Sequence, residues 1–365
     1  MEIKWLHLKS FRNYQDQEVD FRPGLTILQG ENGQGKTNIL EGIYYLLTGK
    51  SYRVHREQEL ARWGENEFHL YGDFIVQRRK LRLESHYQDK RKIIKINQIP
   101  CRKLSEYVGT INVVFFSPDD LVMVKGGPAE RRRFLDLHIA QHHSKHIQLL
   151  NAYNKVLQQK NALLKQGQGG SKSQIAQIEL WNEQILRIGS EIIRNRWEFT
   201  GLLSRKGQEI YGQISAGKEE LTMDYHALGK NNLEEALAAF PKLLAEKMSL
   251  EMERKMVLIG PHRDDILFKL NERSARLYGS QGQQRSIVLS TKLAELEVIR
   301  QEKGDYPLLL LDDVLSELDR FRRDYLLDYT KSLQQTIMTM TSAETLTQRA
   351  SLLLKVEKGQ IGRIE

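Results

Sequence analysis

Short runs of alternating apolar and polar residues, separated by turn residues, occupy most of the first third of the chain. This alternation predicts strands, and residues 68–76, 80–87 and 92–96 have the spacing of an antiparallel meander. One helix is expected after residue 37. Its apolar residues recur on one side: Ile39, Leu40, Ile43, Leu46 and Leu47. The pattern of residues 3–116 therefore predicts a region of short strands with a single helix.

The middle of the chain changes to a helical period. Residues 130–253 contain few prolines and predict long helices, with breaks at the glycine-rich run 166–171 and at 215–217. Strand and helix return afterwards: a helix is expected from Gly282 to near Gly304, and the apolar run 308–311 predicts a buried strand. We expect three segments, 1–125, 126–256 and 257–365, of which the outer two form one α/β head and the middle one a helical lobe.

A glycine-rich loop joins the apolar run 25–28 to the first helix. Its sequence has every fixed position of a phosphate-binding loop: Gly30, Glu31, Asn32, Gly33, Gln34, Gly35, Lys36 and Thr37. The glycines allow backbone N–H groups to surround nucleotide phosphates, Lys36 reaches the β and γ phosphates, and the Thr37 hydroxyl can ligate Mg²⁺. The loop therefore predicts ATP or GTP binding.

Two carboxylates follow the buried strand predicted at 308–311. Asp312 can hold the Mg²⁺ shell, and Asp313 can orient or deprotonate the attacking water. Alone, two acids after a strand can also be a solvated turn; together with Lys36 they predict a hydrolytic site. The chain between the two motifs is far longer than one βαβ crossover needs, so a large insertion must separate them.

A third polar motif lies at the start of the helix predicted near Gly282. Ser280 or Gln281 can cap this helix, and its free N–H groups and positive dipole end suit a phosphate. A plain capped helix is the simpler interpretation of this motif taken alone. The simpler interpretation of the polar turn 316–319 is likewise that it begins the next helix.

Composition narrows the class of partner. The 365 residues include 55 Lys and Arg against 47 Asp and Glu, a net charge of +8 that favours polyanions. The single cysteine, Cys101, excludes an internal disulfide and fits a reducing cytosol. Neither a leader at the N-terminus nor an apolar run long enough to span a bilayer is visible, so a cytoplasmic protein without a membrane partner is expected.

The order of these motifs resembles the ATP-binding-cassette heads of SMC-type chromosome and repair proteins, and within that class the bacterial RecF family of recombination and repair ATPases. The resemblance covers nearly the whole chain. It rests on the segments SFRNY (10–14), PDD (118–120), GP (127–128), RRRFLD (131–136), GPHRDD (260–265) and LDDVLSELD (311–319).

The resemblance implies an ATP-binding-cassette P-loop head with an antiparallel β subdomain and a mostly helical second lobe. In such heads Ser280 and Gly282 would touch the γ-phosphate of ATP held by a second subunit, and Asp319 would help to couple the two sites. Lys36, Ser280, Asp312 and Asp313 are then the expected catalytic residues, with Thr37 and Asp312 on Mg²⁺. The expected nucleotide contacts are Arg12, Asn13, Gly30, Asn32, Gly33, Gly35, Lys36, Thr37, Asn38, Ser280 and Gly282.

The chain departs from general ATP-binding-cassette proteins at three places. Asp313 stands where transporters carry Glu, residues 113–118 contain no Gln to sense Mg²⁺, and Thr339 and Thr341 occupy the neighbourhood of the usual switch His. We therefore expect weak, DNA-stimulated hydrolysis that times a dimer.

Basic clusters occur at 78–80, 90–92 and 131–133, and at Arg53, His55 and Arg56. Each can neutralise DNA phosphates, and each can equally be a solvated face. Without a sequence-reading motif, DNA binding would depend on backbone charge and fall steeply with salt.

Histidines form a second group. His138, His142 and His146 recur along one predicted helix, with His143 beside them, but no Cys or HExxH pattern completes a metal site, and a polar helix face is the better interpretation. We interpret His262 and Arg263, after Gly260 and Pro261, as part of a rigid joint.

The RecF resemblance implies an ATP-induced homodimer that clamps duplex, gapped or junction DNA during recombinational repair and replication restart. RecR and possibly RecO are the implied partners, and loading of RecA the outcome. The alternative is the soluble ATPase subunit of a membrane transporter, which the missing Gln and His and the large insertion disfavour. A ring or filament component is a third class, but heptads are missing and even helices of about 40 residues span only about 60 Å.

Overall fold

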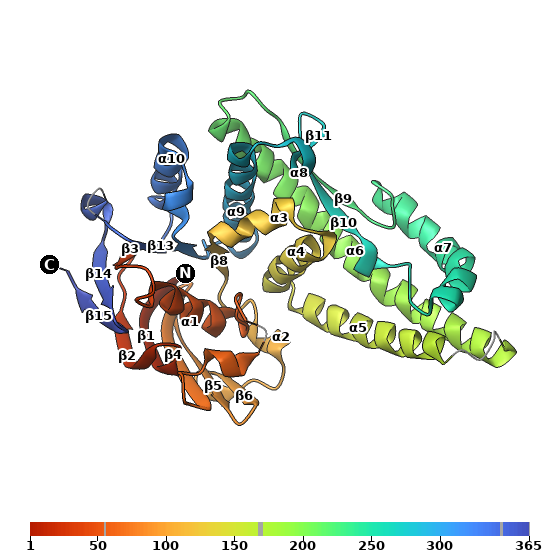
Figure 1. The fold of residues 1–365 in the computed structure, drawn as a ribbon, viewed down its shortest axis with the longest axis horizontal. Coiled ribbons are helices and arrows are strands. Elements are labelled where there is room, and N and C mark those ends of the chain that lie inside the picture. Colours follow the sequence, from red (N-terminus) through yellow and green to blue (C-terminus); the bar gives the residue numbers. More distant parts are fainter. Residues whose placement is uncertain (55, 167–170, 344–345, 365) are drawn as a thin grey trace. The chain divides into compact units, whose positions relative to one another are not determined.

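The computed structural model describes residues 1–54, 56–166, 171–343 and 346–364. It contains two compact units. One combines Met1–Asp120 with Lys292–Glu365, and the other is Leu121–Thr291 (Figure 1). The first unit is thus assembled from both ends of the chain.

The first sheet of the terminal unit is antiparallel, in the order β2-β1-β4-β5-β6-β7. Its strands are β1 Glu2–Phe11, β2 Tyr14–Asp20, β4 Glu67–Val76, β5 Arg79–Gln88, β6 Arg91–Ile96 and β7 Ile99–Pro100. The meander predicted at 68–96 is confirmed as β4, β5 and β6. Alternate residues of β4 are buried, as expected of a sheet with one face on the core.

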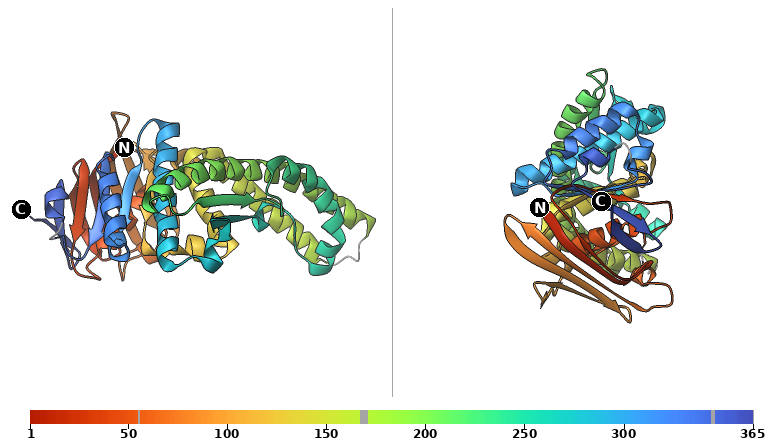
Figure 2. Two further views of the ribbon diagram at one scale, coloured as in Figure 1. Left: turned by 90° about the horizontal axis from the view of Figure 1, so that it is seen from above. Right: turned by 90° about the vertical axis from the view of Figure 1, so that its left-hand side faces the viewer.

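The second sheet is mainly parallel, in the order β15-β14-β3-β13-β12-β8, and lies in a separate layer (Figure 2). Its strands are β3 Gly24–Gln29, β8 Val113–Phe116, β12 Leu308–Asp312, β13 Gln335–Met340, β14 Leu352–Glu357 and β15 Gln360–Arg363. Only β15 pairs antiparallel. Every residue of β12 is buried, which explains its continuous apolar run. Because β13 pairs with both β3 and β12, the ends of those two strands flank it at one edge.

Helix α1, Lys36–Thr48, contacts strands of both sheets. It is buried on more sides than its predicted apolar face, because Glu41, Tyr44 and Tyr45 are buried as well. The other helices of this unit are α2 Leu104–Tyr107, the C-terminal part of α9 Gln281–Lys303, and α10 Arg320–Thr330. The 3₁₀ turns are Glu57–Leu60, Pro118–Leu121, Val314–Glu317 and Thr347–Arg349.

The other unit is mostly helical, as predicted. Its long helices are α4 Pro128–His142, α5 Ser144–Lys165, α6 Lys172–Ile214 and α7 Leu233–Arg254, and α6 packs along α5 (Figure 1). Shorter elements are α3 Val122–Lys125, the 3₁₀ turn Pro261–Arg263 and α8 Ala275–Tyr278. The break predicted at 215–217 follows α6 directly; of the run 166–171, residues 167–170 lie outside the described residues.

A small antiparallel sheet, which the helical period did not predict, completes this unit. It has the order β11-β10-β9 and consists of β9 Leu221–His226, β10 Asp265–Leu270 and β11 Arg273–Ser274. Since β9 and β10 pair along their full lengths, the border expected after residue 256 falls inside the unit Leu121–Thr291. The border expected after residue 125 lies close to the start of that unit.

The histidines expected on one helix lie on two, because α4 ends at His142 and α5 begins at Ser144. His138 packs against Phe134, and His142 against Phe199. His146 is fully buried and contacts Asp136 at 3.1 Å. Among the described residues, no helix is both long and apolar enough to cross a membrane.

Candidate functional site

The phosphate-loop motif lies between β3 and α1, where its glycines are sterically required. Gly35 has φ 114°, and a side chain there would meet the side chains of Asn13 and Tyr14. A side chain at Gly30 would fall on the carbonyl oxygen of Val356. Gly33 also has a positive φ of 82°, and Asn32 beside it is exposed. The loop is therefore held close to β14 and to the turn after β1.

Lys36 folds back over this loop. Its Nζ donates hydrogen bonds to the carbonyl oxygens of Gly30 at 2.6 Å and Glu31 at 2.8 Å. Burial lowers the pKa of Lys36, while the nearby carboxylates of Asp313 and Asp312 act to raise it. The structure thus places the cation of the loop in the field of both predicted acids.

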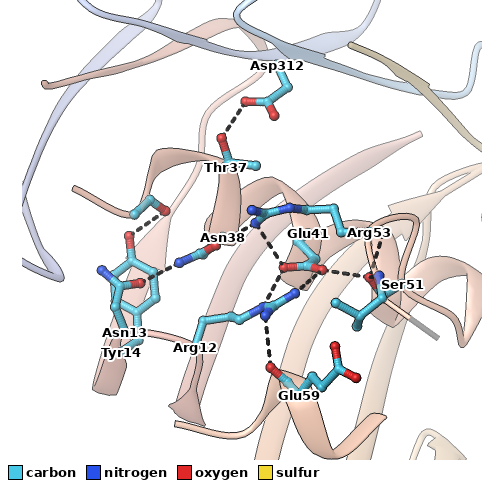
Figure 3. A network of polar contacts seen from close by, with 12 residues as sticks. Arg12, Asn13, Tyr14, Thr37, Asn38, Glu41, Ser51, Arg53, Glu59 and Asp312 are labelled. Atoms are coloured by element: carbon cyan, nitrogen blue, oxygen red, sulfur yellow. Dashed lines mark hydrogen bonds and ion pairs between the residues drawn. The ribbon is translucent and has the colours of Figure 1, made fainter. Parts of the chain in front are cut away.

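Thr37 and Asp312 meet directly at the edge where β3 and β12 end (Figure 3). Thr37 Oγ1 donates to Asp312 Oδ1 at 2.8 Å, and Thr339 Oγ1 donates to the same oxygen at 2.8 Å. Burial raises the pKa of Asp312, and the hydrogen bonds from Thr339 and Thr37 partly offset this. A hydroxyl and a carboxylate oxygen, both hard ligands, therefore converge beside the phosphate loop.

Asp313 follows in a left-handed conformation, with φ 50°, which is uncommon for a residue with a side chain. Its backbone N–H donates to Thr339 Oγ1 at 2.9 Å. Thr339, expected near the position of the switch His, is thus buried and joins the backbone of one acid to the carboxylate of the other. Thr341 is exposed, beyond the end of β13.

Arg12 lies in the turn between β1 and β2 and forms a bidentate ion pair with Glu41 of α1. Its Nε and Nη2 donate to the two Glu41 oxygens at 2.8 Å each, and Nη1 donates to the carbonyl oxygen of Glu59 at 2.8 Å (Figure 3). The Glu41 side chain is fully buried, and Arg53 lies 3.6 Å from it. Sequence reasoning did not identify Glu41.

Asn13 connects this ion-pair cluster to the phosphate loop. Its amide nitrogen donates to the carbonyl oxygen of Gln34 at 3.0 Å, and its Oδ1 accepts from Asn38 at 2.8 Å. Asn38 Oδ1 in turn accepts from Arg53 at 3.0 Å. Asn13 and Asn38 are therefore joined directly, and Arg12 is connected to them through Glu41 and Arg53 (Figure 3).

Ser280 and Gly282 lie in the other compact unit, at the start of α9. Ser280 Oγ accepts the backbone N–H of Gln283 at 3.2 Å, and the Gln283 side chain accepts the Ser280 N–H at 2.6 Å. This reciprocal pair is a capping box, so Ser280, the first of the two expected candidates, is the cap. Ser280 is exposed.

Asp319 caps α10, the helix expected to begin after the 316–319 turn. Its carboxylate accepts the Arg322 N–H at 3.0 Å and pairs with the Arg322 side chain. The backbone hydrogen bond from Arg322 lowers the pKa of Asp319. About half of the Asp319 side chain remains accessible, so its local role is that of a helix cap on the surface.

The basic cluster at 131–133 is largely internal to its unit. Arg131 forms a bidentate ion pair with Asp265 at 2.7 and 2.9 Å, and Arg132 donates to the Asp264 carbonyl oxygen at 2.7 Å. Arg133 is exposed. This cluster therefore leaves one cation for an external phosphate.

The other basic residues lie in hairpin turns, in strands β5 and β6, or at the site itself. Arg78 and Lys90 lie at the exposed turns of the β4–β5 and β5–β6 hairpins. Lys92 instead pairs with Glu57 and donates to the Gly49 carbonyl oxygen at 2.9 Å. His55 lies outside the described residues.

His262, at the expected rigid joint, is held by Tyr153, whose hydroxyl lies 2.8 Å from Nδ1. Burial lowers the pKa of His262 to about 4, so it is neutral near pH 7. Gly260 beside it has φ 139°, a conformation that side chains rarely adopt. These contacts agree with a structural role for this segment.

Comparison with known proteins gives the family. Residues 2–364 match the family described as the RecF/RecN/SMC N terminal domain. The chain is 40% identical, over 99% of both sequences, to the DNA replication and repair protein RecF of Halalkalibacterium halodurans. The chain belongs to the RecF family. RecF of Bacillus subtilis is 39% identical over 99% of this chain and 100% of its own length.

Solved structures agree with this assignment. A structure of the recombination mediator protein RecF with ATP, in the RecFOR pathway, covers 100% of this chain and 97% of its own, with a TM-score of 0.91 and 30% identity. The Smc head domain of Pyrococcus furiosus, 19% identical with a TM-score of 0.57, shares the fold. The ATP-binding-cassette head expected from the motifs is confirmed, and the transporter alternative is not favoured because full-length relatives are RecF proteins.

Proposed function

We propose that this RecF-family chain binds ATP with Mg²⁺ and, when it is bound, closes as a homodimer on DNA during recombinational repair and replication restart. The observation that carries the proposal is the hydrogen bond between Thr37 Oγ1 and Asp312 Oδ1, which joins the phosphate loop to the acid-ending strand. The RecF relative whose structure contains ATP supports the choice of nucleotide.

The loop residues bind the nucleotide. Backbone N–H groups from Gly30 to Thr37 surround the phosphates, and Lys36 exchanges the carbonyl oxygens it now contacts for phosphate oxygens. Thr37 and Asp312 fit Mg²⁺ because their oxygens already converge, and bound Mg²⁺ would neutralise charge on the phosphates. Asp313 accepts a proton from the attacking water or orients it.

Ser280 and Gly282 act in the partner subunit's site. The capping box leaves Ser280 exposed at a helix N-terminus, where backbone N–H groups and the dipole favour a phosphate. Each nucleotide is then enclosed by the loop of one subunit and the α9 start of the other. Hydrolysis is weak, DNA-stimulated, and opens the dimer.

The wider setting follows from the relatives. RecF of the solved structure is described in the RecFOR pathway, which supports RecR and possibly RecO as partners and RecA loading as the result. The chain binds duplex, gapped or junction DNA without sequence preference, through the charge of the DNA backbone. The cytoplasmic location stays a prediction, as does the division into segments 1–125, 126–256 and 257–365.

The test measures mass by sedimentation and DNA affinity by fluorescence anisotropy, with ATP, with ADP and without nucleotide, across a salt series. ATP should raise both the dimer fraction and the affinity for gapped and duplex DNA, and salt should weaken DNA binding steeply. A monomer whose DNA affinity is the same under all three conditions would disprove the proposal. Lys36→Ala serves as the control that cannot hold nucleotide.

A further inference from the structure

Glu41 holds two arginines on one buried carboxylate, next to the phosphate loop. Arg12 contacts both of its oxygens at 2.8 Å, and Arg53 Nη1 lies 3.6 Å from Oε2. The Glu41 side chain is completely inaccessible, while those of Arg12 and Arg53 are 18% and 42% accessible. A fully buried carboxylate thus anchors two arginines whose side chains remain partly accessible.

Glu41 takes only part of the hydrogen-bonding capacity of Arg12. Within the described part of the chain, contacts use three of the five N–H groups of this guanidinium, two on Glu41 and one on the Glu59 carbonyl oxygen. The remaining N–H groups lie on the two terminal nitrogens. A planar fork of this kind suits a phosphate oxygen.

The backbone of Arg12 also needs an anchor. Its φ is 54°, a left-handed conformation that costs energy for a residue with a side chain. A hydrogen bond from its N–H to the Leu60 carbonyl oxygen and the ion pair with Glu41 hold it there. Without Glu41, the guanidinium would lose its bidentate partner and its fixed direction.

The same cluster is connected to the phosphate loop by polar contacts. Arg53 donates to Asn38, Asn38 donates to Asn13, and Asn13 donates to the Gln34 carbonyl oxygen within the loop (Figure 3). Each link measures 3.0 Å or less. A change at Glu41 therefore reaches the loop through Arg53 as well as through Arg12.

We infer that Glu41 is a positioning residue for ATP, which aims Arg12, and with it Arg53, at the phosphates held by the Lys36 loop. The inference rests on the proposed ATP function and adds to it the residue that orients these cations. Glu41 itself does not touch the nucleotide, since its carboxylate is buried beneath the guanidinium groups.

The test is a double-mutant cycle with the fluorescent analogue N-methylanthraniloyl-ATP. Glu41→Gln keeps the shape of the side chain but removes the charge, and should weaken analogue binding about tenfold. Arg12→Ala should weaken it at least as much. Because Glu41 acts mainly through Arg12, the double variant should bind at most about twofold more weakly than Arg12→Ala, and this residual loss belongs to Arg53.

Glu59→Gln is the matched control. The Glu59 carboxylate makes no hydrogen bond or ion pair in the described part of the chain, only its carbonyl oxygen contacts Arg12, and that oxygen survives the substitution. The control should bind the analogue like the parent. An equal loss in both Gln variants would mean that net charge, not positioning, is responsible, and would overturn the inference.

The remaining outcomes are decisive. Unchanged affinity in a Glu41→Gln protein that melts like the parent refutes the role of Glu41 alone, whereas a parent that does not bind the analogue refutes the proposed function. Losses that multiply in the double variant also refute positioning through Arg12. Should Glu41→Gln not fold, Arg12→Ala is compared with the double variant. A difference of at most about twofold supports the inference, and a larger further loss overturns it.

Discussion

Thr37 and Asp312 are joined by a 2.8 Å hydrogen bond although 275 positions separate them in the chain. The contact closes the terminal unit, because Thr37 lies in the first turn of α1 and Asp312 ends β12, a strand that follows the helical lobe in sequence. The proposed nucleotide site therefore requires segments from both ends of the chain.

Asp312→Asn should stabilise the protein without nucleotide and abolish its response to ATP. Burial raises the pKa of Asp312 above its value in the unfolded chain, so the folded state favours the uncharged carboxyl group. The charged carboxylate therefore lowers the free energy of unfolding at neutral pH, and this loss shrinks as the pH falls through the raised pKa. The melting temperature without nucleotide should rise or stay equal, while the shift caused by Mg²⁺ and ATP disappears.

The pH dependence of the parent provides a second measure for Asp312. The proposed Mg²⁺-dependent ATP binding requires the charged carboxylate of Asp312. Since burial raises the pKa of Asp312, this binding should weaken on acidification at a higher pH than for an ordinary aspartate. Asp313→Asn is the matched control for Asp312→Asn. It should keep the ATP-induced melting shift but hydrolyse ATP more slowly. Normal hydrolysis in that variant would remove Asp313 as the base.

Thr339→Val should damage the site, and Thr339→Ser should not. The Thr339 hydroxyl donates to Asp312 at 2.8 Å and accepts the Asp313 N–H at 2.9 Å. Valine therefore leaves the buried Asp312 carboxylate and the partly buried Asp313 N–H each short of a partner. A loss of about 1–3 kcal/mol in the free energy of unfolding is expected, together with slower hydrolysis. Serine restores both bonds. Thermal melting and phosphate release of the two variants distinguish the hydroxyl from the methyl group, and equal behaviour would contradict this assignment.

Ser280→Asp should block the ATP-dependent dimer while sparing ATP binding by the monomer. Aspartate can still accept the Gln283 N–H and cap α9, but it adds a negative charge where the partner's phosphate is proposed to lie. Ser280→Asn keeps the cap without the charge and should dimerise. Sedimentation with ATP measures both. Normal dimerisation of the Asp variant would place the phosphate contact elsewhere.

The local parts of this site were predictable from sequence, and the contacts between distant segments were not. Lys36, Thr37 and Asp312 belong to motifs whose glycine spacing and apolar strand are encoded within a few residues. Glu41 follows Leu40 in an ordinary helical run, and only the burial of α1 between two sheets makes its charge significant. Arg12 meets it across 29 positions, a contact that no local period predicts.

Strand β9 shows the same limit. Residues 221–226 are a six-residue strand within a long helical region, and their partner, β10, lies beyond α7. Pairing with a distant strand, rather than local periodicity, makes this segment β9 and holds residues 257–291 in the helical unit. The sequence interpretation ended the lobe at 256 because the helical period ends there.

The helical lobe allows a prediction about stability alone. Lys160 of α5 and Glu251 of α7 are both fully buried, with Lys160 Nζ 2.5 Å from Glu251 Oε2 and 2.5 Å from Asn182 Oδ1 of α6. Burial lowers the pKa of Lys160, and Glu251 opposes that shift. Lys160→Met would leave Glu251 charged and buried, at a cost of about 3–5 kcal/mol.

The double variant Lys160→Met/Glu251→Gln should recover most of this loss, because no charge stays buried and the glutamine oxygen can still accept the Leu258 N–H that Glu251 now accepts at 2.8 Å. Lys206→Met, in the more exposed pair with Glu209, should cost at most about 1 kcal/mol. Urea midpoints followed by helical circular dichroism rank the three proteins. A double variant as unstable as Lys160→Met would show that packing of the lysine stem, rather than the unpaired carboxylate, accounts for the loss.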